Sequence, residues 1–190
     1  MVAPTGSLGS WDAKIIITNM FPLLVVLSVV VLFAGIRLES AEELLEEFAL
    51  LAVMVPTMVA MGGNLGAILS ARLSTRFHLG TTELDPRDRV LWANVLAILA
   101  LAFTIFTTLA LAAYVLGLVI GAELGLGTLL FISLVSGMSV AFLAVIFSFV
   151  ATYVSYRLGI DPDDTTIPVV TNLVDVFGMV IFVGVSIAAV

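Results

Sequence analysis

The sequence predicts an all-α integral membrane protein with five transmembrane helices, the second of them broken near a Gly-Gly-Asn segment. Two observations on composition indicate the class: 62% of the residues are hydrophobic and 11% are charged, and the mean hydropathy is +1.26. Soluble domains average about 45–50% apolar and about 25% charged residues. A third observation is that the apolar residues gather in long runs, and a spanning helix needs roughly 20 of them.

The apolar runs follow one another with short polar connections, within a length of 190 residues that suits one domain. The first run carries no charge, the third and fourth have length to spare, and the fifth is interrupted only by Asp175. We expect residues 1–13 to form an N-terminal cytoplasmic tail and residues 14–190 a transmembrane domain, without a cleaved signal peptide. The expected spans are 15–36, 48–71, 90–122, 124–156 and 165–190.

The positive charges predict the orientation, because cytoplasmic loops of membrane proteins carry an excess of Lys and Arg. With five spans, all of the 7 lysines and arginines except Arg37 fall on one side. The N-terminus should therefore be cytoplasmic and the C-terminus outside, and we expect the plasma membrane as the location. The outer side then carries an acidic run that we interpret as a solvated face: Glu39, Glu42, Glu43, Glu46 and Glu47.

The composition excludes several kinds of site. The chain has no cysteine, which rules out disulfides, thiolate nucleophiles and cysteine-based metal sites, and its single histidine, His78, rules out an all-histidine site within one chain. A net charge of −7 disfavours nucleic acid as a partner and suits a protein that handles cations. One loop histidine and one deep carboxylate are a poor set of catalytic groups, so we expect no enzyme.

The helix pattern is first disturbed in the segment VPTMVAMGGNLGAILSARLST. Pro56 removes a backbone donor, and Gly62 and Gly63 weaken the helix. One interpretation is a broken helix whose carbonyls, together with the side chain of Asn64, line an ion path. The other is a glycine-mediated helix contact, because Gly62 and Gly66 form a small-xxx-small pair. The local pattern supports both equally.

The second disturbance is the acidic connection GIDPDDTTIPVV before the last span. Asp161-Pro162 is typical of a helix stop, and Asp163 or Asp164 is a candidate cap for the next helix. Capping and solvation account for these three aspartates more simply than a function does. The functional alternative is an acidic cytoplasmic mouth that concentrates cations.

Asp175 is the charge that most needs an explanation. Counted from Thr165 at 1.5 Å per residue, it lies about 15 Å into the span, near the middle of a hydrocarbon core about 30 Å thick. An aspartate there costs about 2.5–3.5 kcal/mol on insertion scales. It could be protonated and hydrogen-bonded to Asn64, Asn94 or Asn172, it could pair with a cation from another span, or it could face water and bind a mobile ion.

The neighbours of Asp175 favour the third alternative. Asn172 and Thr171 lie three and four residues before it, which places all three side chains on one helix face. No Lys or Arg lies deep in any expected span. A polar stripe of this kind is typical of an ion path.

The two disturbed segments resemble a known family. They are similar to the membrane domain of the MgtE magnesium channels and still more closely to the eukaryotic carriers of solute carrier family 41. The similarity covers roughly residues 13–190 and the number of spans also matches. A "GNLxxxLASRLST"-like segment is present as Gly63-Asn64-Leu65 followed by LSARLST, and the acidic pattern as Asp161-Pro162-Asp163, Pro168 and Asp175.

The resemblance implies a five-helix unit that works as a pair. Two copies would form the pore between them, with one aspartate per copy on the fifth helix binding hydrated Mg²⁺, and Asp175 matches that position. Gly62, Gly63 and Asn64 match the segment beside the path. The sequence departs from the family in three ways. No sensor domain precedes Lys14, Asp164 stands where the carriers often have Asn, and there is one unit where the carriers hold two.

These features together predict transport of a divalent cation, Mg²⁺ above all, by a homodimer in the lipid bilayer. Asp175 would coordinate the hydrated ion with Asn172, Thr171 and Asn64 near it. A lone aspartate per chain, doubled by two-fold symmetry, supplies the one or two carboxylates that hydrated Mg²⁺ usually takes. The alternatives are an exchanger that couples Mg²⁺ to Na⁺ and an accessory membrane subunit without a pathway.

Overall fold

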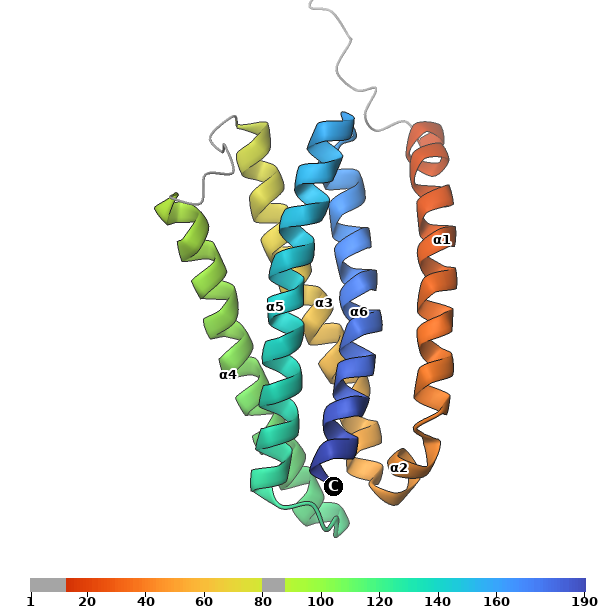
Figure 1. Cartoon of the computed structure of the whole chain (residues 1–190), viewed down its shortest axis with the longest axis vertical. Helices are drawn as coiled ribbons and strands as arrows, with labels where there is room; N and C mark the ends of the chain where they lie inside the picture. Colours follow the sequence, from red (N-terminus) through yellow and green to blue (C-terminus); the bar gives the residue numbers. More distant parts are fainter. Residues whose placement is uncertain (1–12, 80–87) are drawn as a thin grey trace, which may run out of the picture.

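A computed structural model of the chain describes residues 13–79 and 88–190. The described part is helical, and its long helices lie side by side as one bundle (Figure 1). The expected cytoplasmic tail falls almost entirely outside the described residues. The helices are α1 (Ala13–Glu39), α2 (Glu42–Glu47), α3 (Ala49–His78), α4 (Arg89–Ile120), α5 (Leu126–Leu158) and α6 (Pro162–Ala189).

The long helices alternate in direction. α1, α4 and α6 run one way along the bundle, and α3 and α5 run the other way, so the beginning of α1 and the C-terminus lie at opposite ends (Figure 1). We call the end with the start of α1 and the α5–α6 connection the first end, and the end with α2 and the C-terminus the second end. α5 packs against α3, α4 and α6, and α1 packs against α6.

Four of the expected spans are present as helices long and apolar enough to cross a membrane: Ala49–Arg76, Arg89–Ile120, Leu126–Leu158 and Thr165–Ala189. The helix expected first is also formed, as α1, but the apolar stretch found within its described part, Met20–Ile36, is shorter than the others. Large apolar side chains such as Phe103 on α4 and Phe142 on α5 are exposed on the outside of the bundle. They suit contact with lipid chains, and the protein is a multi-pass membrane protein.

The expected break in the second span is wrong. α3 is helical from Ala49 to His78 and continues through Gly62, Gly63 and Asn64. Proline and glycine are tolerated inside transmembrane helices because neighbouring helices and local adjustment satisfy the freed backbone groups. The helix-contact alternative is what the structure shows, since a Cβ at Gly62 would lie 2.5 Å from Val140 Cγ1 of α5.

Two connections also differ from expectation. The acidic segment after the first span contains the short helix α2, whose Leu44 and Leu45 pack partly against the core while its glutamates are exposed. The helix before the acidic connection ends at Leu158 with Gly159 in the left-handed conformation at φ 68°, earlier than the expected stop at Asp161-Pro162. α6 then begins at Pro162, where proline is favoured as a first helical residue.

This start of α6 corrects the expected cap. With Pro162 as the first helical residue, Asp161 precedes the helix, while Asp163 and Asp164 lie within its first turn and therefore cannot be its cap. The side chains of Asp163 and Asp164 lie outside the described part of the structure.

Candidate functional site

Asp175 lies at the middle of α6 and its carboxylate faces α3. Its side chain is partly buried, and its Oδ1 atom is buried without a hydrogen-bond partner among the described residues. The bundle thus places one carboxylate oxygen, unpaired, halfway between its two ends. Leaving a buried acceptor unpaired costs about 1–3 kcal/mol, and more for a charged group.

The residue opposite this carboxylate is Gly63. A Cβ atom built on Gly63 would lie 2.9 Å from Asp175 Oδ1 and 3.7 Å from Thr171 Cβ, which is too close for the carboxylate to stay where it is. Glycine at this position therefore leaves the room that the carboxylate occupies. The sequence analysis expected Gly63 to act through its backbone, whereas the structure shows that its missing side chain makes room for the Asp175 carboxylate.

The flanking residues pack tightly and hold α3 against α6. A Cβ at Gly66 would lie 2.7 Å from Val170 Cγ1, and one at Gly62 would lie 3.0 Å from Val174 Cγ1. Both valines are buried. The contact on either side of Gly63 is thus apolar and closed, and the polar group lies between two packed layers.

The two other polar residues predicted on α6 are held by their own helix. The Thr171 hydroxyl donates to the Ile167 carbonyl at 2.9 Å, and Asn172 Nδ2 donates to the Pro168 carbonyl at 2.8 Å. An amide that donates through its nitrogen keeps its oxygen as an acceptor. Thr171 shares the Gly63 contact with Asp175, so these two are brought together.

The three asparagines considered as partners of Asp175 are engaged elsewhere or turned away. Asn64 is exposed, although it follows Gly63 directly. Asn94 Oδ1 accepts from Arg72 Nη1 at 2.9 Å, and Asn172 donates within α6. Neither of the two ion pairs found among the described side chains includes Asp175. The structure therefore shows neither the hydrogen-bonded alternative nor the ion-paired alternative.

A buried hydroxyl network behind the site was not predicted. Ser148 of α5 donates to the Gly66 carbonyl at 3.2 Å, and Ser70 donates to Ser148 at 3.0 Å. These bonds fix α3 to α5 and so hold the Gly63 backbone in place. The signal in the sequence was the spacing of small residues at every fourth position, Gly62, Gly66, Ser70 and Ser74, which lie on one buried face of α3.

The first end of the bundle carries polar contacts between helices. Arg76 Nη2 lies 2.6 Å from Asp88 Oδ2, which joins the end of α3 to the start of α4. The pKa of Asp88 lies below its ordinary value because its carboxylate accepts from the Val90 backbone N–H and, second, from Arg76. Asp161, predicted as part of an acidic mouth, lies at this end with its Oδ1 3.5 Å from His78 Nε2.

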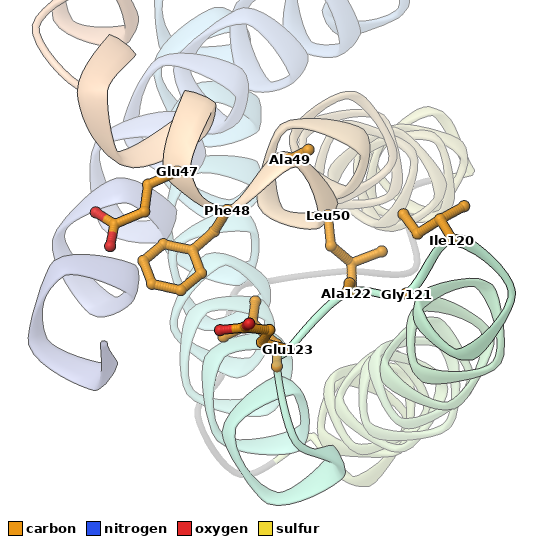
Figure 2. Close-up of a pocket in the computed structure, with 9 residues that line it drawn as sticks. Glu47, Phe48, Ala49, Leu50, Ile120, Gly121, Ala122 and Glu123 are labelled. Atoms are coloured by element: carbon orange, nitrogen blue, oxygen red, sulfur yellow. The ribbon is translucent and has the colours of Figure 1, made fainter.

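The second end is acidic. A pocket of ≈ 310 Å³ lies between the start of α3 and the α4–α5 connection. Two glutamates line this pocket, and Figure 2 shows the Glu47 and Glu123 carboxylates on opposite sides of the Phe48 ring in this view. No group of three or more His, Asp or Glu side chains within the described residues could hold a metal ion. This end therefore presents negative potential rather than a formed metal site.

Comparisons with known proteins identify relatives of this chain. The family model of MgtE, described as a divalent cation transporter, matches residues 55–185, which include all of the α3–α6 contact described above. Solute carrier family 41 member 3 of Mus musculus is 26% identical over 179 residues, which cover 87% of this chain and 36% of that protein. The chain thus spans about a third of the length of this relative.

The family match covers more than half of the chain, and it indicates a transporter rather than an enzyme. The resemblance seen in the two disturbed segments is confirmed, and these segments fall on the helices that the structure packs around Asp175. The chain belongs to the MgtE family of divalent cation transporters.

Proposed function

We propose that this protein transports Mg²⁺ along a path beside α3 and α6, with Asp175 binding the hydrated ion. The observation that carries the proposal is the buried, unpartnered Oδ1 of Asp175 at the middle of the bundle. Buried charges are normally paired or coordinate a metal, and intramembrane carboxylates generally mark ion pathways. A mobile cation with its water would supply the missing partner.

The donor set favours a hydrated ion over a dehydrated one. Mg²⁺ gives up water reluctantly and is usually held by one or two carboxylates. The Asp175 carboxylate and the Thr171 side chain both lie near Gly63, and Asn172, three residues before Asp175, keeps a side-chain oxygen that would accept from a water of the ion. Such a set can hold the waters of the ion through hydrogen bonds.

A second copy of the chain would complete the site. Two-fold symmetry doubles each group, so two Asp175 carboxylates would face one ion across the axis. Asn64 supports this arrangement, because it is an exposed amide inside a membrane helix, next to Gly63. In a dimer with α3 at the interface, Asn64 would turn toward the shared path rather than toward lipid.

The dimer can be tested because the chain has no cysteine. Asn64→Cys should form an intermolecular disulfide in the membrane, whereas a cysteine in place of Val119, an exposed residue of α4, should not. Equal cross-linking at both positions, or none at Asn64, would contradict a dimer built on α3.

The topology completes the proposal. α1 packs against α6 and runs with it along the bundle, so we infer that α1 also crosses the membrane and brings the number of spans to five. The first end, which carries Arg72, Arg76 and Arg157, would face the cytoplasm of a plasma membrane. Asp161, Asp163 and Asp164 would then lie at the cytoplasmic mouth, and the acidic second end would attract cations outside.

The deciding experiment is Mg²⁺ uptake by purified protein in liposomes. Asp175→Asn keeps the size of the side chain and deletes its charge. Losing charge-assisted hydrogen bonds to the ion's waters removes on the order of 1.5–3 kcal/mol, so uptake at low Mg²⁺ should fall at least about tenfold. Folding should survive, because an amide is easier to bury than a carboxylate.

The matched control is Glu43→Gln, the same kind of change at an exposed position of α2. It should leave uptake near normal. Normal uptake by well-folded Asp175→Asn would end the ion-site proposal, and no uptake by the wild type would favour an accessory subunit. Uptake that requires an opposing Na⁺ gradient would identify an exchanger.

A further inference from the structure

We propose that His78 and Asp161 form a proton-dependent clasp between α3 and α6 at the first end of the bundle. His78 is the last residue of α3, and Asp161 directly precedes α6. His78 Nε2 lies 3.5 Å from Asp161 Oδ1, and the two side chains are 49% and 52% exposed. Both line a pocket of ≈ 330 Å³ that is open to solvent, so protons can reach them.

The hydrogen bond on the other side of the imidazole ring makes the contact depend on protonation. His78 Nδ1 lies 3.0 Å from the Ser74 carbonyl oxygen, which can only accept a hydrogen bond. The Ser74 hydroxyl is farther away, at 3.4 Å. The closer contact therefore requires a proton on Nδ1 in both charge states of the ring.

This assignment fixes what Nε2 presents to Asp161. In the neutral ring with its proton on Nδ1, Nε2 carries a lone pair, and a lone pair facing a carboxylate is repelled. In the imidazolium form, Nε2 gains a proton and can donate to Asp161 with the added attraction of opposite charges. The contact is thus attractive at lower pH and is lost as the pH rises.

Within the described part of the chain, two arginines at this end contact groups other than Asp161. Arg76 lies against Asp88, and the Arg157 Nε donates to the Tyr153 hydroxyl at 2.9 Å. The groups that line the pocket with His78 are Tyr156 from α5 and the connection from Gly159 to Pro162. Of the described side chains, Asp161 is the one that forms an ion pair with His78.

The position of the clasp gives it a consequence for the rest of the bundle. α3 and α6 are the two helices that hold Gly63 against Asp175, and the clasp joins their ends on one side. α6 is also tied to α5 there by the 2.9 Å contact of Ser155 with Thr165. Protonation of His78 would add a contact between α3 and α6 at the same end. The ends of these two helices would therefore be held together at low pH and free to separate at high pH.

The first test uses the fact that His78 is the only histidine in the chain. With ¹⁵N-labelled histidine in the full-length protein, every imidazole signal comes from this ring. At pH 8.5 the nitrogen shifts should report the tautomer with the proton on Nδ1, the less common one for free histidine. A predominant Nε2–H tautomer would overturn the proposal, because the neutral ring could then donate to Asp161.

The second test measures the clasp itself. Cysteines replacing Leu79 and Ile160, both exposed, can carry spin labels without background from native cysteines. The distance distribution between the labels should be shorter and narrower at pH 5.5 than at pH 8.5. The equilibrium between closed and open ends should change by up to about fivefold, the range for exposed ion pairs.

Two variants separate the clasp from general acid effects. Asp161→Asn should abolish the pH response because it removes the carboxylate. His78→Gln should also abolish it, because it removes the group that gains the proton. Asp88→Asn, which removes a carboxylate at the same end but from another pair, should keep the response. A response that persists in folded Asp161→Asn protein would overturn the proposal. None of these readouts depends on ion transport.

Discussion

Gly63 on α3 and Gly137 on α5 each lie at a helix contact where the missing side chain makes room for a residue of the neighbouring helix. The two contacts differ in which residue occupies that room. At Gly137 the neighbour is the ring of Phe106 from α4, and a Cβ built there would collide with it. At Gly63 the neighbour is the carboxylate of Asp175. The first contact is apolar, and the second leaves a buried carboxylate oxygen without a partner.

The surroundings of the two contacts sharpen the difference. Ser133 donates to the Phe106 carbonyl at 2.7 Å, while the buried Ser136 hydroxyl next to Gly137 has no hydrogen-bond partner among the described residues. Phe106 is fully buried in the main core. The polar groups beside the Phe106 ring are neutral hydroxyls, whereas the α3–α6 contact contains a carboxylate oxygen without a partner. A glycine at a helix contact thus faces an aromatic ring in one place and, in the other, the carboxylate at which we propose that the ion binds.

The largest expected effect is on folding at the first contact. In Gly137→Leu the new side chain would overlap the Phe106 ring, and overpacking of this kind costs about 3 kcal/mol, the upper part of the usual range. Thermal unfolding of purified protein in detergent would measure the loss. Gly35→Leu is the control, because nothing lies within 4 Å of the Cβ position at Gly35. Equal unfolding temperatures for both variants would show that the α4–α5 contact is not closely packed.

The next effect is on transport at the second contact. Gly63→Ala places a Cβ 2.9 Å from Asp175 Oδ1, so the carboxylate must move. If Asp175 binds the ion, uptake in liposomes should fall about tenfold, which corresponds to about 1.4 kcal/mol. The free energy of unfolding should fall by less than in Gly137→Leu, because the Asp175 side chain can move aside more easily than the Phe106 ring.

Gly66→Ala is the matched control one turn away. Its Cβ would meet Val170 Cγ1 at 2.7 Å, an apolar contact without the carboxylate. It should destabilise the protein at least as much as Gly63→Ala and reduce uptake per folded molecule less. The opposite order for uptake would separate Gly63 from the function of Asp175.

Composition and spacing predict part of the difference between the Gly63–Asp175 contact and the Gly137–Phe106 contact. Asp175 is conspicuous as a charge in an apolar run, and helical spacing places Thr171 on its face. That Gly63 lies opposite it could not be derived, because the register between α3 and α6 depends on how Gly62 and Gly66 pack against Val174 and Val170. Such tertiary contacts have no local signal.

The helix break expected at Gly62–Asn64 is absent for a physical reason. Glycines lower helix propensity in water, where the exposed backbone can bond to solvent. In an apolar surrounding, the helix is the way to satisfy the backbone, and the space left by Gly62 is filled by Val140 and Val174. The helix therefore continues, and the glycines act through close packing.

A smaller effect is expected from the hydroxyl that supports the second contact. Ser148→Ala removes the donor to the Gly66 carbonyl and leaves the buried Ser70 hydroxyl without its acceptor. The cost should be about 1 kcal/mol, the net value of a typical hydrogen bond. Thermal unfolding would measure it, with Ser139→Ala as the control, since Ser139 is exposed and bonds only its own helix. A loss no larger than in the control would mean that α3 does not depend on this network.

The smallest effect lies outside both contacts, at the pair that joins α3 to α4. The pKa of Asp88 is lowered from its ordinary value of 3.8, first by the hydrogen bond from the Val90 N–H and then by the one from Arg76. A carboxylate with a lowered pKa in the folded state stabilises the protein fully above the unfolded value. That contribution is lost as the pH falls below 3.8 and through the lowered folded value.

Asp88→Asn isolates the charge, because asparagine can still cap α4 by accepting from the Val90 N–H. The wild type should be slightly more stable than this variant at about pH 6, and the gap should close as the solution is acidified toward about pH 2. Thermal unfolding at a series of pH values would show it. Exposed ion pairs often contribute nothing measurable, so a gap that stays constant with pH would assign the whole effect of Asp88 to capping. A gap that closes would show that the charge of Asp88, through the Val90 N–H and Arg76, stabilises this end of the bundle.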